Sequence, residues 1–401
     1  MAYSPYNKAA SVPSEGHDTP CRQIRAQTGA EPPHSSRVGD VIRVADPQLG
    51  RAERAAVDDV LVSGDLADGE EVRAFEDAFG SFVDAEHAVA TANGTAALHA
   101  TFEALDLPAG ATVVTTPFTF VASANAPRFA GLAPRFADVD PETYALDPDA
   151  VERVLERDDD VAAILVVHLY GLPADVRRFA ELAEAYDVAL VEDAAQAHGA
   201  TVDGRPLGTW SDAVCYSFYP TKNMTTGEGG MVTTDDPALA ERLRAFVDHG
   251  RAEASYDHAT VGHNFRMTNL AAAIGTAQLA RLPAYTVARR ENAAYLTEAL
   301  SDAPVETPTE PVGRRHVYHQ YTVRSPERDA LREHLAARGV EAAVYYPRCV
   351  HEQPPYRDAR ADAPVAERLA DEVLSLPVHP QVTEADRETV ADAVRSFRGG
   401  A

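Results

Sequence analysis

Residues 161–193 read VAAILVVHLYGLPADVRRFAELAEAYDVALVED, and this stretch decides the fold class. Apart from their last residues, His168 and Glu192, the ranges 161–168 and 188–192 are apolar without alternation, which is typical of strands buried on two faces rather than one. The segment 176–186 between them is predicted to be a helix. A buried strand, a helix and a second buried strand in succession favour an α/β fold, with a mostly parallel sheet and helices on both faces.

The same alternation of strands and helices extends to both sides of this stretch. Further strands are expected at 88–92, 112–116, 134–139, 213–218 and 231–234. Helices are expected at 51–61, 70–79, 96–105, 121–129, 149–157 and 237–246. Together these elements form a predicted large domain over residues 39–285.

The pattern changes near residue 286, where a smaller C-terminal α+β domain is predicted to begin and to run to residue 401. Its expected elements are helices at 287–301, 329–337, 366–374 and 386–397, and strands at 317–323 and 342–345. Residues 1–38 are polar, with Pro, Ser and Gly scattered through them. They are predicted to be a disordered leader or an over-long gene start.

The composition excludes several classes of function. The net charge of −26 opposes binding to nucleic acid and to anionic membranes. The chain contains no run of about 18 apolar residues, so no membrane-spanning helix is predicted. The cysteines, Cys21, Cys215 and Cys349, are odd in number and far apart, so neither a disulfide framework nor a metal site is predicted. Reduced thiols in a cytoplasm are the expectation.

Lysine is nearly absent from this chain. Of 36 basic residues only Lys8 and Lys222 are lysines, and the other basic residues are arginines. An acidic chain poor in lysine suggests a high-salt cytoplasm, because salt screens surface charge. Arginine can replace lysine in most surface roles, but a guanidinium cannot form a Schiff base. The persistence of Lys222 in the body of the chain therefore indicates a chemical role, the alternative being a leftover surface residue.

Polar residues stand out where predicted strands end, which is the edge at which parallel sheets bind ligands. Residues 93–95 read Asn-Gly-Thr and open a helix, a natural cradle for phosphate, although the same motif also occurs as a plain turn. Asp193 follows a buried strand and must be paired or functional, since an isolated buried carboxylate is costly. Ser217 and Lys222 follow the next strand, and the glycine-rich residues 227–230 allow tight turns beside the lysine.

These segments resemble the DegT/StrS-type sugar-nucleotide aminotransferases in both order and spacing. The matching pieces are 93–98 (NGTAAL), 117–120 (PFTF), 192–196 (EDAAQ), Ser217-Phe218 with Lys222-Asn223, 227–231 (GEGGM) and 262–267 (GHNFRM). The resemblance covers about residues 42–397. It implies the fold-type I architecture of transferases that depend on pyridoxal 5'-phosphate (PLP), and a homodimer with shared active sites.

The resemblance also implies roles for individual residues. Lys222 would form the Schiff base, and Asp193 would partner the ring nitrogen, both as catalytic residues. The other implied cofactor contacts are Gly94, Thr95, Ala96 and Ser217 around the phosphate, Gln196 at the phenolic oxygen, Phe120 against the ring, and Asn264 at the phosphate bound by the other subunit. Possible substrate contacts are Arg266, for the carboxylate of the amino donor, His198 and Tyr346.

A structural role is the alternative interpretation for several of these residues. Phe120 could be core, Arg266 could form an interface salt bridge, and His198 could be structural. The implied reaction moves an amino group, expected from L-glutamate, to a keto-sugar nucleotide and yields an amino sugar for polysaccharide or glycoconjugate synthesis. A keto-cyclitol acceptor and a non-catalytic PLP-fold regulator are the alternatives. A related sugar dehydratase would carry His in place of Lys222, so the lysine argues against that class. A nucleotide-binding dehydrogenase would need G-x-G-x-x-G after the first strand, and this motif is absent.

Overall fold

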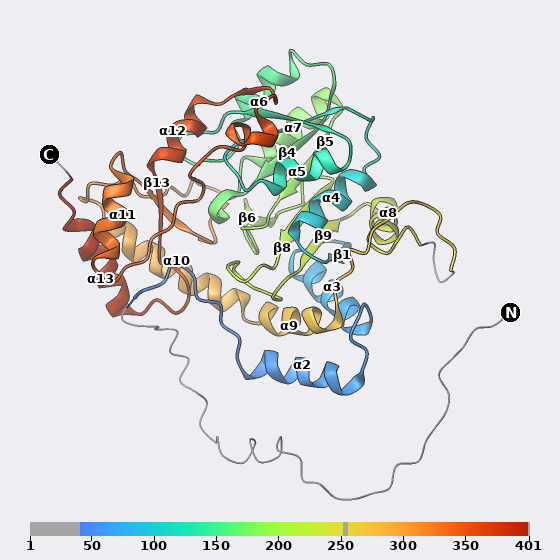
Figure 1. The fold of residues 1–401 in the computed structure, drawn as a ribbon, viewed down its shortest axis with the longest axis horizontal. Coiled ribbons are helices and arrows are strands. Elements are labelled where there is room, and N and C mark those ends of the chain that lie inside the picture. Colours follow the sequence, from blue (N-terminus) through green and yellow to red (C-terminus); the bar gives the residue numbers. More distant parts are fainter. Residues whose placement is uncertain (1–40, 252–255, 400–401) are drawn as a thin grey trace, which may run out of the picture. The chain divides into compact units, whose positions relative to one another are not determined.

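The computed structural model describes residues 41–251 and 256–399. The predicted leader at 1–38 lies outside these residues. An eight-stranded sheet runs through the described chain in the order β1-β9-β8-β5-β4-β2-β3-β12 (Figure 1). Its strands are β1 (His87–Thr91), β9 (Gly230–Thr234), β8 (Ala213–Ser217), β5 (Ala189–Asp193), β4 (Val161–Val167), β2 (Thr112–Thr115), β3 (Ala133–Ala137) and β12 (Ala361–Asp362).

The direction of the strands matches the expected mostly parallel sheet. Strand β9 pairs antiparallel with β1 and with β8. The pairings from β8 through β5, β4, β2 and β3 to β12 are all parallel. The carboxyl ends of the central strands therefore meet at one edge of the sheet, where a ligand site is expected.

Helices cover both faces of this sheet. On one face lie α4 (Gly94–Ala104), α5 (Ala122–Phe129) and α8 (Pro237–Val247). On the other lie α3 (Glu70–Phe82), α6 (Pro148–Leu155), α7 (Val176–Tyr186) and α9 (Asn269–Leu279). Successive residues of β4 serve opposite faces: Leu165 packs in the first layer and Ile164 in the second, and both are fully buried. Burial on two faces explains why this strand is apolar throughout.

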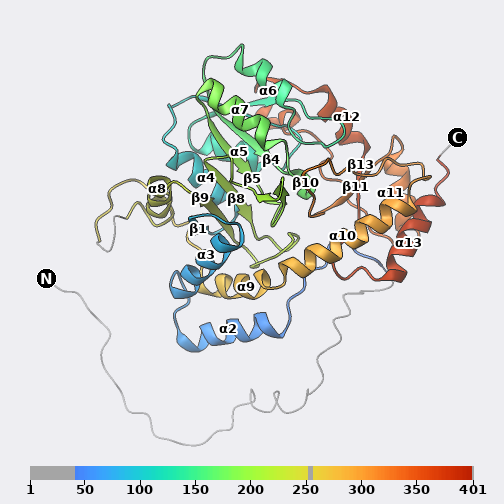
Figure 2. The same cartoon turned by 180° about the vertical axis from the view of Figure 1, so that it is seen from behind.

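The C-terminal part has an apolar cluster of its own. There, α10 (Leu282–Ala299), α11 (Arg328–Ala336) and α13 (Glu384–Arg395) pack around the antiparallel pair β11 (Tyr321–Arg324) and β13 (Val373–Leu376). Figures 1 and 2 show α10 running from α9 to this group of helices. The predicted domain boundary at 285/286 falls inside α10, and β12 returns to the large sheet, so the division into two domains stays a prediction.

The remaining elements are short or peripheral. They are α2 (Arg51–Ser63), α12 (Pro364–Glu372), β6 (Thr201–Val202), β7 (Arg205–Pro206), β10 (Arg314–Arg315), and the 3₁₀ turns η1 (Leu169–Gly171), η2 (Val350–Glu352) and η3 (Pro354–Tyr356). No helix among the described residues combines the length and the apolar character needed to cross a membrane.

Two predicted strands in the C-terminal part are wrong, and one predicted helix ends earlier than expected. The strand expected at 317–323 begins only at Tyr321, because Tyr318 has a left-handed backbone (φ +45°) that interrupts extended structure. The strand expected at 342–345 is a single bridge between Ala343 and Ser375. The helix expected at 366–374 ends at Glu372, since the buried residues that follow pair with β11 as β13. Helix α9 was not predicted.

Candidate active site

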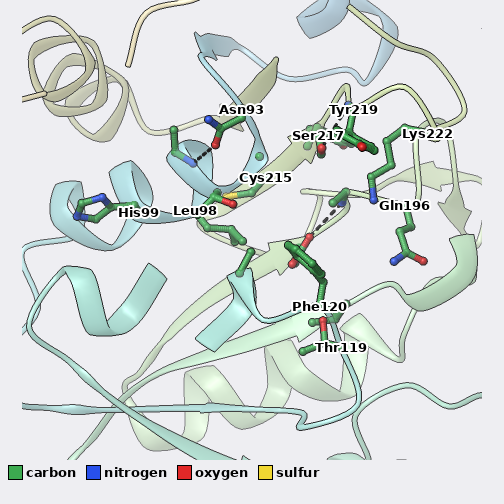
Figure 3. Close-up of a pocket in the computed structure, with 18 of the residues that line it drawn as sticks. Asn93, Leu98, His99, Thr119, Phe120, Gln196, Cys215, Ser217, Tyr219 and Lys222 are labelled. Carbon is green, nitrogen blue, oxygen red and sulfur yellow. Dashed lines mark hydrogen bonds between the residues drawn. The ribbon is translucent and has the colours of Figure 1, made fainter. Parts of the chain in front are cut away.

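A cavity of about 1060 Å³ opens at the carboxyl edge of the sheet. Its walls come from the β1–α4 turn, the segments after β2, β5 and β8, and two C-terminal segments. Figure 3 shows Lys222, Gln196 and Phe120 at one end of this cavity and His99 at the other. Of the residues predicted from the sequence, those that line the cavity are Gly94, Thr95, Ala96, Phe120, Asp193, Gln196, Ser217, Lys222 and Tyr346.

The first turn of α4 forms an anion cradle. Asn93 caps the helix, and its Oδ1 accepts the backbone N–H of Ala96 at 2.9 Å. A Cβ on Gly94 would lie 2.7 Å from the Cβ of Ser217, so only glycine lets the turn approach the end of β8 this closely. A Cβ on Gly230 would lie 2.5 Å from the carbonyl oxygen of Asn93. Free N–H groups, the helix dipole and the hydroxyls of this turn together favour a phosphate.

Asp193 is the last residue of β5, and its side chain is almost completely buried. One carboxylate oxygen accepts the hydroxyl of Ser123 at 2.9 Å, and the other accepts the N–H of Ala195 at 3.1 Å. Burial raises the pKa of Asp193, while these hydrogen bonds and the charge of Lys222 oppose the shift. A buried carboxylate at a cavity wall is well placed to receive a cationic N–H of a ligand.

Lys222 lies in the loop that follows β8. The loop is folded back on Phe218, whose carbonyl accepts the hydroxyl of Thr225 at 2.8 Å and the N–H of Thr226 at 3.1 Å. Burial lowers the pKa of Lys222 to about 8, and the negative charge of Asp193 opposes this shift. Near neutral pH a substantial fraction of the amine is therefore unprotonated, which a nucleophile or a general base requires.

Two further side chains complete this end of the cavity. The Oε1 of Gln196 accepts the N–H of Tyr170 at 2.7 Å, and its Nε2 donates to the Tyr346 hydroxyl at 3.3 Å. The ring of Phe120 is 55% exposed in this chain, and its centroid lies 6.2 Å from that of Tyr346. Phe120 is therefore a wall of the cavity rather than part of the core.

The other three predicted residues do not line the cavity. His198 is fully buried between the rings of Tyr216 and Phe218, and burial lowers its pKa to about 3. Arg266 pairs with Asp248 at 2.9 Å and donates to the side chain of Asn264. A role for Asn264 and Arg266 in the site of another subunit stays a prediction.

The sequence interpretation missed two residues that contact the site. Ser123 donates a hydrogen bond to Asp193. It lies on α5, one turn after Phe120, and that position could have marked Ser123 as a site residue. Tyr170 orients Gln196 from the end of β4, where a polar residue after a buried strand was a usable signal. His319 and Gln320 also line the cavity. The aromatic character of His319 allowed a substrate contact, with packing as the alternative, whereas Gln320 carried no signal in the sequence.

This combination of groups defines a class of protein. A lysine of lowered pKa, a buried aspartate, an anion cradle at a helix N-terminus and an aromatic wall fit the carbonyl, ring nitrogen, phosphate and ring face of PLP. The chain is a PLP-dependent aminotransferase. More specifically, it belongs to the DegT/DnrJ/EryC1/StrS aminotransferase family, whose sequence profile matches residues 47–395.

Individual relatives are similar over most of their length. A UDP-N-acetyl-3-dehydro-alpha-D-glucosamine 3-aminotransferase of Acidithiobacillus ferrooxidans is 37% identical over 329 residues, covering 82% of this chain and 88% of that one. A pleiotropic regulatory protein of Geobacillus stearothermophilus is 38% identical over 348 residues, covering 85% and 93%. The crystal structure of DesV from S. venezuelae in complex with a ketimine intermediate matches with a TM-score of 0.83 at 38% identity, covering 86% and 93%.

Proposed function

We propose that this enzyme transfers an amino group from L-glutamate to a keto-sugar nucleotide and so makes an amino sugar for polysaccharide or glycoconjugate synthesis. The observation that carries the proposal is the convergence of Lys222, Asp193 and the α4 N-terminus on one cavity. A relative named as a UDP-sugar aminotransferase supports the class of acceptor. The acidic composition supports a cytoplasm of high salt as the working environment.

Different residues of the cavity would contact different parts of the cofactor. When bound, PLP supplies a carbonyl that exchanges amino groups and a ring that accepts electrons. The N-terminus of α4, with Thr95 and Ser217, would bind its phosphate. Asp193 would accept the N–H of the protonated ring nitrogen, which would offset the cost of burying the carboxylate. Phe120 would pack against the ring, and Gln196 would have an N–H left for the phenolic oxygen.

Lys222 holds the cofactor and then moves the proton. Its amine, with a pKa of about 8, would hold the carbonyl carbon of the cofactor until an amino donor takes its place. The Nζ of Lys222 would then act as the base that takes a proton from the donor and as the acid that returns it. In the second half of the cycle the same amine works in the opposite order on the keto sugar.

The enzyme is proposed to work as a homodimer with shared sites. The cavity of one chain is lined by no arginine among the described residues, yet the donor carboxylate and a nucleotide diphosphate are both anionic. Asn264 of one subunit would reach the phosphate held by the other. Arg266 would approach the donor carboxylate if it exchanged its Asp248 partner.

An absorbance titration with L-glutamate in molar KCl tests this proposal. Wild-type protein loaded with PLP should show a visible band that the donor bleaches, and keto-sugar nucleotides should then restore it. Lys222→Arg keeps the positive charge but should lose the band, as should Lys222→Ala. A band that ignores every amino donor would contradict transamination. Restoration by a keto-cyclitol, and by no keto-sugar nucleotide, would replace the acceptor class.

A regulator is the second candidate, favoured by the relative named as a pleiotropic regulatory protein. Such a protein would bind PLP through the same residues without turnover. Wild-type protein that binds PLP stoichiometrically, yet forms no product with any donor and acceptor pair, would support it. Product formation that is lost in Lys222→Arg would exclude a purely regulatory role.

A further inference from the structure

Tyr170 and Gly171 form a tight turn directly after β4. Both have left-handed backbones, with φ of +58° and +96°. A Cβ on Gly171 would lie 2.9 Å from the carbonyl oxygen of Gln196, the backbone nitrogen of His319 and a methyl carbon of Val317. Segments from two distant parts of the sequence, at residue 196 and at residues 317–319, therefore close on one glycine, and a side chain there would push them away.

Tyr170 makes hydrogen bonds to Gln196, Gln320 and Tyr345, which belong to three segments that line the cavity. Its N–H donates to the Oε1 of Gln196 at 2.7 Å, and its carbonyl accepts the N–H of Gln320 at 3.2 Å. Its hydroxyl donates to the carbonyl of Tyr345. The hydroxyl is completely buried, and burial raises its pKa well above the usual range, so it stays a donor at every physiological pH.

The bond to Gln196 decides which way its carboxamide faces. A backbone N–H can only donate, so the atom of Gln196 beside Tyr170 must be the oxygen. The amide nitrogen then faces the Tyr346 hydroxyl, to which it donates at 3.3 Å. Its second N–H remains for a ligand oxygen. The backbone N–H of Tyr170 and the hydroxyl of Tyr346 therefore hold the Gln196 carboxamide from its two sides.

We propose that Tyr170 is a positioning residue for the transamination proposed above. Its backbone N–H orients the Gln196 carboxamide. Its hydroxyl holds the segment at Tyr345 and Tyr346, which fixes the other side of the same carboxamide. The proposal rests on the proposed function for its kinetic consequences, but the linkage itself concerns the protein alone.

Three tyrosine-to-phenylalanine variants and one double variant test the linkage. The variants Tyr170→Phe and Tyr346→Phe should each slow the half-reaction with L-glutamate by about tenfold, the effect of one lost hydrogen bond in a buried site. The double variant should be no slower than Tyr346→Phe, because both hydroxyls act on the same carboxamide. The matched control is Tyr144→Phe. Tyr144 packs edge-on against Tyr170 at 6.0 Å, and its hydroxyl makes no hydrogen bond to a described residue. Its rate should stay within about twofold of wild type.

Two further readouts do not require turnover. Hydrogen exchange of the cofactor-free protein should become faster around residues 343–347 in Tyr170→Phe and stay unchanged elsewhere, and PLP affinity should fall in parallel with the rate. Multiplying effects in the double variant, or wild-type exchange and rate in Tyr170→Phe, would overturn the proposal. Wild-type protein that ignores all donors would instead contradict the proposed function, and exchange and PLP affinity would still decide the linkage.

If Tyr170→Phe does not fold, Gln196→Leu tests the same arrangement. A leucine side chain can neither accept the Tyr170 N–H nor form a hydrogen bond with the Tyr346 hydroxyl. In that background, Tyr346→Phe should have no further effect on PLP affinity. An additional loss as large as in wild type would show that Tyr346 acts independently of Gln196, and would overturn the proposal.

Discussion

The cavity has two walls of different origin. The sheet-edge wall consists of residues 93–96, 193–196 and 217–222, which follow strands of the large sheet. The loop wall consists of residues 319–320 and 345–346, which belong to the C-terminal part. The first wall carries the charges and the nucleophile, and the second carries amides and hydroxyls held by Tyr170. We infer that the sheet-edge wall performs the chemistry, and that the loop wall positions Gln196 through Tyr346 and sets how the substrate fits.

The largest expected effect is that of Asp193→Asn on the sheet-edge wall. Turnover should fall by roughly 10³-fold, because the ring nitrogen loses its charged partner in a buried site. Folding stability should move the other way. Burial raises the folded-state pKa of Asp193, so above its ordinary pKa the ionised carboxylate lowers the stability of the cofactor-free protein.

Calorimetry of the cofactor-free proteins at pH 7 checks the second half of this prediction. The melting temperature of Asp193→Asn should be at least that of wild type. A clear loss of stability with unchanged turnover would make Asp193 structural and would break the division between the walls.

Gly94→Ala tests the geometry of the same wall. The added Cβ would meet the Cβ of Ser217 at 2.7 Å and force α4 away from β8. PLP affinity, measured by fluorescence titration, should fall roughly 10- to 100-fold. Gly50→Ala is the control, since its Cβ would meet side-chain ends, those of Arg281 at 3.2 Å and Glu53 at 3.5 Å, and it should retain PLP affinity. Equal losses in the two variants would contradict a specific cradle.

Much of the sheet-edge wall was predictable from sequence, because buried strands are apolar throughout and the polar residues that end them are conspicuous. Lys222 and Asp193 were found in this way. Of the loop wall only Tyr346 was predicted as a substrate contact, since the shape of this wall depends on contacts between distant segments. Tyr318 leaves the extended region, and Val373 joins a strand only because β11 lies beside it. Likewise, no sequence pattern reveals that Asp248 pairs with Arg266.

The pH dependence of cofactor uptake tests the charge balance within the sheet-edge wall. Because Lys222 has a pKa of about 8 and reacts when unprotonated, the rate of PLP uptake should rise about tenfold per pH unit below that value and then level off. The negative charge of Asp193 raises this pKa, so Asp193→Asn should move the midpoint to lower pH. A stopped-flow midpoint near 10.5, the ordinary value, would show that Lys222 is not desolvated.

Gln320→Leu probes the loop wall. The amide oxygen of Gln320 is buried, has no hydrogen-bond partner among the described residues, and belongs to a residue that lines the cavity. It is suited to accept a hydroxyl of the sugar. The variant should raise the KM of the keto-sugar nucleotide by about tenfold and leave the half-reaction with L-glutamate unchanged. A slower donor half-reaction would mean that Gln320, like Tyr346, acts on the donor half-reaction rather than on the fit of the acceptor.

Phe120 lies where the two walls meet, and it has a natural control two residues away. Phe118 is fully buried in the core, whereas Phe120 is 55% exposed and faces Tyr346. Phe120→Leu should weaken PLP binding by about fivefold, the value of an aromatic stack, and leave the melting temperature unchanged. Phe118→Leu should do the reverse and lower the free energy of unfolding by roughly 1–2 kcal/mol through imperfect packing. Because the two substitutions are chemically identical, a difference between them reports only where each ring lies. If Phe120→Leu lost stability rather than affinity, Phe120 would belong to the core after all, and the cavity would lack the aromatic face that joins its walls.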